Sequence, residues 1–100
     1  MPNVVDKYIP TYDLESFKQS DFEIKRSALL GAASLGFTRA DIREAVQTMT
    51  PKQFYKSMTS YRNHRLWQDV YHVPFRGIMI YVKFTLGTIT DFALLSFKEK

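Results

Sequence analysis

The sequence of 100 residues predicts an α+β domain, in which helices of the first half pack on one face of an antiparallel β-sheet formed by the second half. Two patterns predict this class. Capping residues and helical spacing of apolar residues mark the first half, whereas apolar and polar residues alternate with period two after residue 65. Because the chain has no repeat, low-complexity tract or Pro/Gly-rich linker, we expect one domain over residues 1–100.

Local signals place a helix, a strand and a second helix near the N-terminus. Thr11 is a suitable cap for a short helix over residues 12–18. Apolar and charged residues alternate over 22–25, which indicates a short strand. The second helix is expected to open at Ser27 and to end at Gly36, because glycine readily adopts the left-handed conformation found at helix ends.

A third helix is predicted where capping and periodicity agree. Thr38 is expected to open it. Apolar residues then recur at the spacing of one helical face, at Ile42, Ala45, Val46 and Met49.

The run Thr50-Pro-Lys-Gln has the form of a capping box with proline at the first helical position. It predicts one more short helix directly after the third. This helix would carry Phe54 and Met58 on the side that docks, and Lys52 and Lys56 on a free side.

Three strands are predicted in the second half, over residues 66–75, 78–86, and 89 or 92 to 98. Gly87 and Thr88 offer a turn that makes the last two strands an antiparallel hairpin.

The length of this turn decides which side chains of the hairpin meet. If the connection has an even number of residues, Ile80 and Val82 share one face with Leu95 and Ala93. The other face then holds four polar residues, Tyr81, Lys83, Ser96 and Lys98. An odd connection would break this coincidence, because a slip of one residue turns every side chain to the opposite face.

Composition narrows the function classes. Residues 1–50 carry six Lys/Arg against seven Asp/Glu, and residues 51–100 carry eight against three, so the second half favours a polyanionic partner. The absence of cysteine excludes disulfides and thiolate chemistry, and two histidines alone cannot build a closed zinc site. No long apolar run is present, so we expect a cytoplasmic protein that does not span a membrane.

Short motifs in the basic half hold the candidate functional residues. They are Phe-Tyr-Lys-Ser-Met at 54–58, Leu-Trp-Gln-Asp-Val-Tyr at 66–71, Ile-Tyr-Val-Lys at 80–83 and Ser-Phe-Lys-Glu-Lys at 96–100. Their polar side chains would suffice for phosphodiester cleavage without a metal or other cofactor. Each residue also has a purely structural interpretation: lysines are common on solvated surfaces, and tyrosine on a sheet is commonly a packing residue.

These motifs resemble the MqsR family, the messenger-RNA interferase toxins of MqsR/MqsA toxin-antitoxin systems. The resemblance covers Arg26-Ser-Ala-Leu-Leu, residues 53–61, Trp67-Gln-Asp-Val-Tyr, Tyr81 with Lys83, and the terminal Ser-Phe-Lys-Glu-Lys. Residues 1–25 and 37–50 are similar only in outline, and the loop at 87–90 is longer than we expect for the family.

The resemblance implies a RelE-like fold and cleavage of messenger RNA at GC-containing triplets such as GCU, without the ribosome. It implies as partner a zinc-binding antitoxin with a DNA-binding helix-turn-helix domain, so any zinc belongs to that partner. The residues implicated in catalysis in the family correspond here to Lys56, Gln68, Tyr81 and Lys98.

A metal-free ribonuclease of this kind activates a ribose 2′-hydroxyl to attack the adjacent phosphorus, which requires a base, positive charge and a proton donor. Lys56 can act as a base only if burial and nearby positive charge lower its pKa, whereas a phosphate clamp needs no such shift. Tyr81 can donate a proton or orient the phosphate, and Gln68 can only orient. Lys98 would add positive charge.

Further residues are candidates for substrate binding. Tyr55 can stack on an unpaired base, or can equally serve the core or an antitoxin contact. Arg62, Arg65 and Lys83 are candidate phosphate contacts. Histidine is a common general acid and base, because its unperturbed pKa is about 6.5. The spacing of His64 and His72 does not pair them and the resemblance does not select them, so we assign them no catalytic role.

Two other functions fit the same composition. A non-catalytic basic module that binds RNA or an acidic protein also needs a basic, aromatic face. A structural subunit could pair an exposed sheet edge with another protein.

Overall fold

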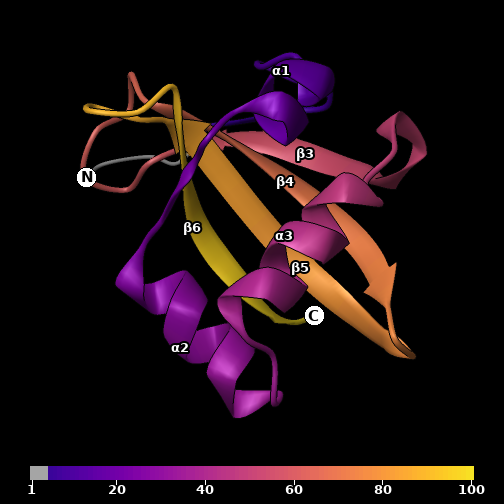
Figure 1. The fold of residues 1–100 in the computed structure, drawn as a ribbon. Coiled ribbons are helices and arrows are strands. Elements are labelled where there is room, and N and C mark those ends of the chain that lie inside the picture. The colour runs from indigo at the N-terminus through magenta and orange to yellow at the C-terminus, as the bar shows by residue number, and fades with distance from the viewer. Residues whose placement is uncertain (1–4) are drawn as a thin grey trace.

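The computed structural model describes residues 5–100, and there it contains three α-helices, one 3₁₀ helix and one six-stranded sheet (Figure 1). In chain order the elements are β1 (Asp6–Lys7), α1 (Leu14–Gln19), β2 (Glu23–Ile24), α2 (Arg26–Ser34), α3 (Arg39–Gln47), η1 (Pro51–Gln53), β3 (Phe54–Thr59), β4 (Trp67–Phe75), β5 (Ile78–Leu86) and β6 (Phe92–Glu99). The predicted α+β class is confirmed.

The sheet has the strand order β1-β3-β4-β5-β6-β2. Strands β3 to β6 form an antiparallel meander, and β1 pairs antiparallel with β3 at one edge. At the other edge β2 runs parallel to β6, so the sheet is mixed rather than purely antiparallel as predicted.

The helices begin and end near the predicted residues. Asp13, not Thr11, caps α1, and its carboxylate accepts the backbone N–H of Ser16 at 2.9 Å. Helix α2 starts one residue before Ser27, and Gly36 lies just beyond its end with φ +82°, as predicted.

The helix predicted from the signal at Thr50 is wrong beyond its first turn. The capping box of Thr50 and Gln53 forms, but it closes only the single 3₁₀ turn of η1. Residues 54–59 are strand β3 instead, because pairing with β4 satisfies their backbone groups. Phe54 therefore packs against Tyr71 in the core, with ring centroids 5.5 Å apart, whereas Met58 faces the other side of the sheet.

The hairpin of β5 and β6 reaches the predicted arrangement by a different route. Leu86 pairs with Phe92, so the connection over residues 87–91 has an odd number of residues. A β-bulge at Leu95 then shifts the register by one, and Tyr81 pairs with Lys98 and Lys83 with Ser96, as predicted. The predicted core partners Leu95 and Ala93 are wrong. The odd connection places Phe92 and Leu94 in the core, and the bulge then places Phe97 there as well.

One hydrophobic core joins the helices to the sheet. It contains Leu14 and Phe17 of α1, Ala28 and Ala32 of α2, Ile42, Ala45 and Val46 of α3, and alternate residues of β4, β5 and β6. The rings of Phe17 and Phe84 are stacked, with centroids 3.8 Å apart and planes 1° from parallel. In Figure 1, α3 crosses in front of β5 and α2 lies beside β6.

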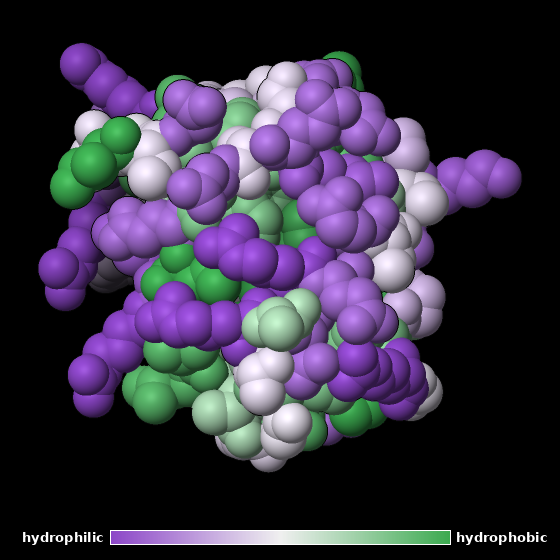
Figure 2. Space-filling view, viewed as in Figure 1, coloured by the Kyte–Doolittle hydropathy of each residue, from purple (hydrophilic) through white to green (hydrophobic). Residues whose placement is uncertain are grey.

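Hydrophilic side chains cover most of the surface on this side of the molecule (Figure 2). Apolar side chains gather at the lower left of the view, in the region of α2, where Leu30 is exposed. Among residues 5–100, no helix is long and apolar enough to cross a membrane.

Gly31 sets how closely α2 approaches β6. A Cβ atom at this position would clash with the backbone carbonyl oxygen of Phe97 and lie 3.3 Å from the Cβ of Lys98. Replacing glycine by alanine normally stabilises a helix interior by about 1 kcal/mol, but here the neighbouring atom is backbone and cannot rotate away.

We therefore expect Gly31→Ala to lower the free energy of unfolding by about 2 kcal/mol, because α2 must move away from the sheet. Urea unfolding followed by circular dichroism measures this change. Ser34→Ala, an exposed position in the same helix, is the control and should change stability by less than about 0.5 kcal/mol. A stabilised Gly31→Ala protein would contradict the close approach.

Candidate active site

The side chains of β3 to β6 that alternate with the core residues form a second surface, which we call the polar face. Its polar and aromatic members include Tyr55, Lys56, Gln68, His72, Tyr81, Lys83, Ser96 and Lys98. Register places most of them in two neighbouring cross-strand rows. One row runs from Lys56 through Val70 and Lys83 to Ser96, and the other contains His72, Tyr81 and Lys98.

Three rings form a ladder along the second row. His72 stacks on Tyr55 with ring centroids 4.3 Å apart, and the centroid of Tyr81 lies 6.1 Å from that of His72. A lysine lies near each end of the ladder. Lys56 Nζ is 5.5 Å from the centroid of the Tyr55 ring, and Lys98 Nζ is 5.3 Å from that of the Tyr81 ring. Such a row of rings and cations suits unpaired RNA, whose bases stack while its phosphates bind cations.

Lys56 is held by Asp6 of β1, whose carboxylate lies 3.1 Å from its Nζ. This hydrogen bond raises the pKa of Lys56, and so keeps the side chain charged at neutral pH. Of the two roles that the sequence leaves open, the phosphate clamp is therefore favoured over the base. Asp6 is not among the predicted site residues, because nothing in the local sequence indicates that it pairs with a residue 50 positions later.

Two aromatic groups of the ladder keep fixed protonation states near neutral pH. Burial raises the pKa of Tyr81, so its hydroxyl keeps its proton and can donate it. Burial, together with nearby Lys100, lowers the pKa of His72, so its imidazole is neutral. The sequence did not indicate a partner for His72. In the folded sheet its ring lies between those of Tyr55 and Tyr81.

Gln68 lies on the polar face opposite Met58 and is buried, with 8% of its surface exposed. It is two residues from Val70, which pairs with Lys56, so its amide belongs to the same surface. An amide in this place can orient a phosphate or a base edge without changing charge.

Arg62 and Arg65 lie elsewhere, in the loop between β3 and β4. Both are exposed, and their backbone N–H groups donate to the side chains of Ser60 and Asn63, which fold the loop. The structure does not bring them into the two rows. They remain predicted phosphate contacts outside these rows. His64 is exposed in the same loop.

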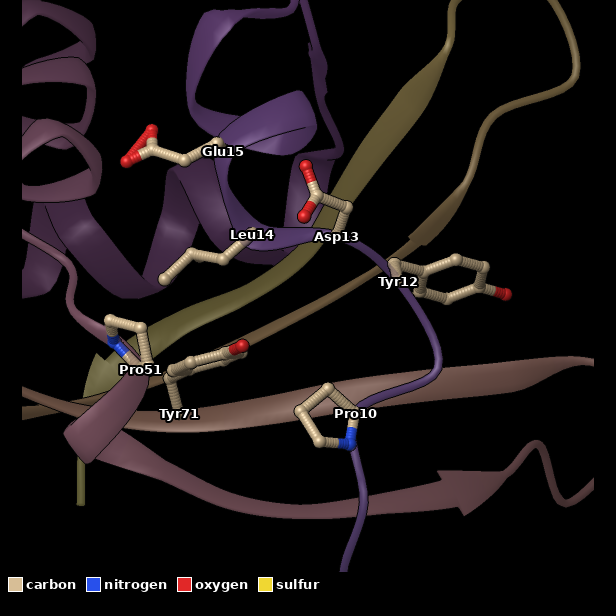
Figure 3. Close-up of a pocket in the computed structure, with 7 residues that line it drawn as sticks. All are labelled: Pro10, Tyr12, Asp13, Leu14, Glu15, Pro51 and Tyr71. Atoms are coloured by element: carbon tan, nitrogen blue, oxygen red, sulfur yellow. The ribbon is translucent and has the colours of Figure 1, made fainter.

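A pocket of about 270 Å³ lies on the core side of the sheet, where α1 begins (Figure 3). It is lined by Pro10, Tyr12, Asp13, Leu14, Glu15, Pro51 and Tyr71. Its acidic groups are the Asp13 carboxylate, which is engaged in capping α1, and Glu15, which points away from Tyr71 in Figure 3. Burial raises the pKa of Tyr71 to about 12, so its hydroxyl stays protonated.

None of the predicted site residues lines this pocket. Its acidic rim does not suit a polyanion, whereas the polar face offers lysines and aromatic rings. Within residues 5–100, no group of three His, Asp or Glu side chains is arranged to hold a metal ion. We therefore take the polar face as the candidate active site.

Comparison with protein families places the chain in a class of toxins. Residues 9–99 match the family described as "Motility quorum-sensing regulator, toxin of MqsA", and the chain belongs to this family. Over 75 residues it is 41% identical to the mRNA interferase toxin MqsR of Escherichia coli (strain K12), and the alignment covers 75% of this chain and 74% of the relative. The predicted family resemblance is confirmed.

Proposed function

We propose that the chain is the endoribonuclease toxin of a toxin-antitoxin system and cleaves messenger RNA at GC-containing triplets such as GCU, without a metal ion or the ribosome. It acts in the cytoplasm as one RelE-like domain, with the helices packed on one face of the sheet. The observation that carries this proposal is the convergence of Lys56, Tyr81 and Lys98 on one face, in a chain of the MqsR toxin family.

The charge and protonation of these side chains suit cleavage of a phosphodiester bond by the ribose 2′-hydroxyl. Attack of a ribose 2′-oxygen on the adjacent phosphorus gives a cyclic phosphate and a free 5′-hydroxyl. Negative charge grows on the phosphate oxygens in the transition state, and Lys56 and Lys98 stabilise it as ammonium groups. Tyr81 donates its proton to the leaving 5′-oxygen, and Gln68 orients the phosphate or a base.

Substrate binding uses the rest of the polar face. Tyr55 is 46% exposed and its ring is stacked on His72, so the exposed part of this stack can receive an unpaired base. Arg62 and Arg65 extend the positive charge along the RNA backbone from the β3–β4 loop.

The family description names MqsA as the partner of these toxins. We propose that the cognate antitoxin of this chain binds zinc and carries a helix-turn-helix DNA-binding domain. Zinc then belongs to the antitoxin, and the toxin acts without it.

The test is cleavage of a GCU-containing RNA by the purified chain in the presence of EDTA. We expect a cut at this triplet that leaves a cyclic phosphate. We expect no cut when the scissile ribose carries a 2′-deoxy substitution, because the attacking oxygen is gone. A matched RNA without a GC-containing triplet is the control.

Persistent cutting of the deoxy-substituted RNA would exclude the proposed chemistry. Tight binding of intact RNA, with no product at any enzyme concentration, would favour the non-catalytic binding module instead.

A further inference from the structure

Lys83 occupies the middle of the polar face. It lies on β5, where its register partners are Val70 on β4 and Ser96 on β6. Lys56 lies one strand beyond Val70, and Tyr81 is the next residue of β5 on the same face. A group at this place lies in the same cross-strand row as the proposed phosphate clamp, and it follows the proposed proton donor on the same face of β5.

The three lysines of the face have different surroundings. Lys56 forms an ion pair with Asp6, and Lys98 is exposed to solvent with its Nζ over the ring of Tyr81. Lys83 is half-buried, and no carboxylate of residues 5–100 forms an ion pair or hydrogen bond with it. Burial without an acidic partner, beside other cations, is the setting in which a lysine loses its proton most readily.

We infer that Lys83 is the general base that removes the proton from the ribose 2′-hydroxyl, while Lys56 and Lys98 remain charged and bind the phosphate. The inference rests on the proposed ribonuclease function, and it replaces the phosphate contact that the sequence predicts for Lys83.

Protons and bonds balance in this step. The neutral amine of Lys83 accepts the 2′-hydroxyl proton and becomes an ammonium, while the 2′-oxygen forms its bond to phosphorus. The bond from phosphorus to the 5′-oxygen breaks, and this oxygen takes the proton of the Tyr81 hydroxyl. The Lys83 ammonium then loses its proton to solvent, and the Tyr81 phenolate regains one from solvent.

The surrounding charges agree with this role. Burial is the main cause that lowers the pKa of Lys83, and the positive charge of Lys98 lowers it further. The other groups facing this part of the sheet are the Asp6–Lys56 pair on β1 and β3, Tyr55 on β3, the neutral His72 on β4, Tyr81 on β5, and the C-terminal Lys100. The one carboxylate in this set, that of Asp6, is already bound to Lys56.

The first test is Lys83→Arg, because arginine is always positively charged and cannot act as a base near neutral pH. At pH 7 we expect single-turnover cleavage of a GCU-containing RNA to slow by about 10² to 10⁴-fold. Binding of the matching 2′-deoxy RNA should not weaken by more than about threefold, because Lys56 and Lys98, which bind the phosphate, are unchanged and arginine removes no positive charge. Lys25→Arg, at an exposed lysine that follows edge strand β2 and is paired with Glu23, is the control.

The pH dependence of the cleavage rate distinguishes a general base from a phosphate contact. For the unaltered chain, we expect the cleavage rate to rise with pH and to level off once Lys83 is neutral. In Lys83→Arg this plateau should disappear. A Lys83→Arg protein that keeps its rate within about threefold, with an unchanged profile, would overturn the inference.

Chemical replacement of the amine gives a second test that does not depend on arginine fitting the site. Because the chain has no cysteine, Lys83→Cys carries a single thiol, which 2-bromoethylamine converts to a thioether analogue of lysine with a less basic amine. We expect alkylation to raise the cleavage rate of the Lys83→Cys protein at least about tenfold. Compared with the unaltered chain, the rising limb of the pH profile should lie at lower pH, because the amine is less basic. Alkylated Lys25→Cys is the matched control.

Failure of this inference is distinguishable from failure of the proposed function. If the unaltered chain cleaves RNA but alkylation neither restores the rate nor moves the profile, Lys83 is not the base. If the unaltered chain does not cleave RNA at all, the ribonuclease proposal itself fails.

Discussion

Lys56→Ala is expected to slow single-turnover RNA cleavage by about 10² to 10³-fold, because the substitution removes a fixed positive charge where negative charge develops on the phosphate. The Lys56 ammonium is held in place by the carboxylate of Asp6 at 3.1 Å, so its position does not depend on the substrate. Tyr81→Phe should act in the same range, because phenylalanine keeps the ring of the ladder but has no proton to donate.

Stability should change little in either variant. The Lys56–Asp6 pair is partly exposed, and pairs of this kind contribute at most about 1 kcal/mol. Lys52→Ala, an exposed lysine of η1, is the matched control and should cleave at the rate of the unaltered chain. If Lys56→Ala folds normally and retains more than about a tenth of the activity, Lys56 is not part of the catalytic apparatus.

Asp69→Ala is expected to lower the free energy of unfolding by about 3 kcal/mol, which is a large part of the stability of a small domain. Asp69 is fully buried on β4. Its carboxylate accepts the backbone N–H of Thr11 at 3.0 Å and that of Tyr12 at 2.9 Å, and so fixes the segment between β1 and α1 to the sheet. Alanine leaves both N–H groups without this acceptor and opens a cavity.

Urea unfolding, followed by tryptophan fluorescence and by circular dichroism, measures the change. Asp21→Ala is the control, since the Asp21 side chain is exposed and its carboxylate lies 3.9 Å from the Arg43 guanidinium, a weak surface pair. A loss smaller than about 1 kcal/mol for Asp69→Ala would mean that water replaces the carboxylate without a penalty.

Elements with agreeing local signals were predictable from the sequence. In α3 the capping box of Thr38 and the apolar stripe both indicate a helix, and the structure contains that helix. The alternation in residues 67–75 and 78–86 likewise produces β4 and β5. In both cases the local preference and the tertiary packing favour the same conformation.

Local sequence signals gave the wrong prediction where pairing with a residue far along the chain determines the structure. The capping box at Thr50 specifies only the first turn, and the pairing of β3 with β4 makes the next six residues a strand. Strand β1 has two residues and no periodicity, so the contact of Asp6 with Lys56 could not be predicted from local sequence. The shared face of Tyr81 and Lys98 was predicted only for an even turn; the turn is odd, and a bulge at Leu95, which no local signal indicates, restores the pairing.

The odd turn over residues 87–91 and the bulge at Leu95 form a compensated pair. Either irregularity alone would invert the tail of β6, burying Lys98 and turning Phe97 outward, and only together do they leave the polar face intact. Insertion or deletion of a single residue in this turn would therefore disrupt the polar face. A shortening or lengthening by one residue is compatible with the site only if the bulge is lost in the same step, whereas changes by two leave the register untouched.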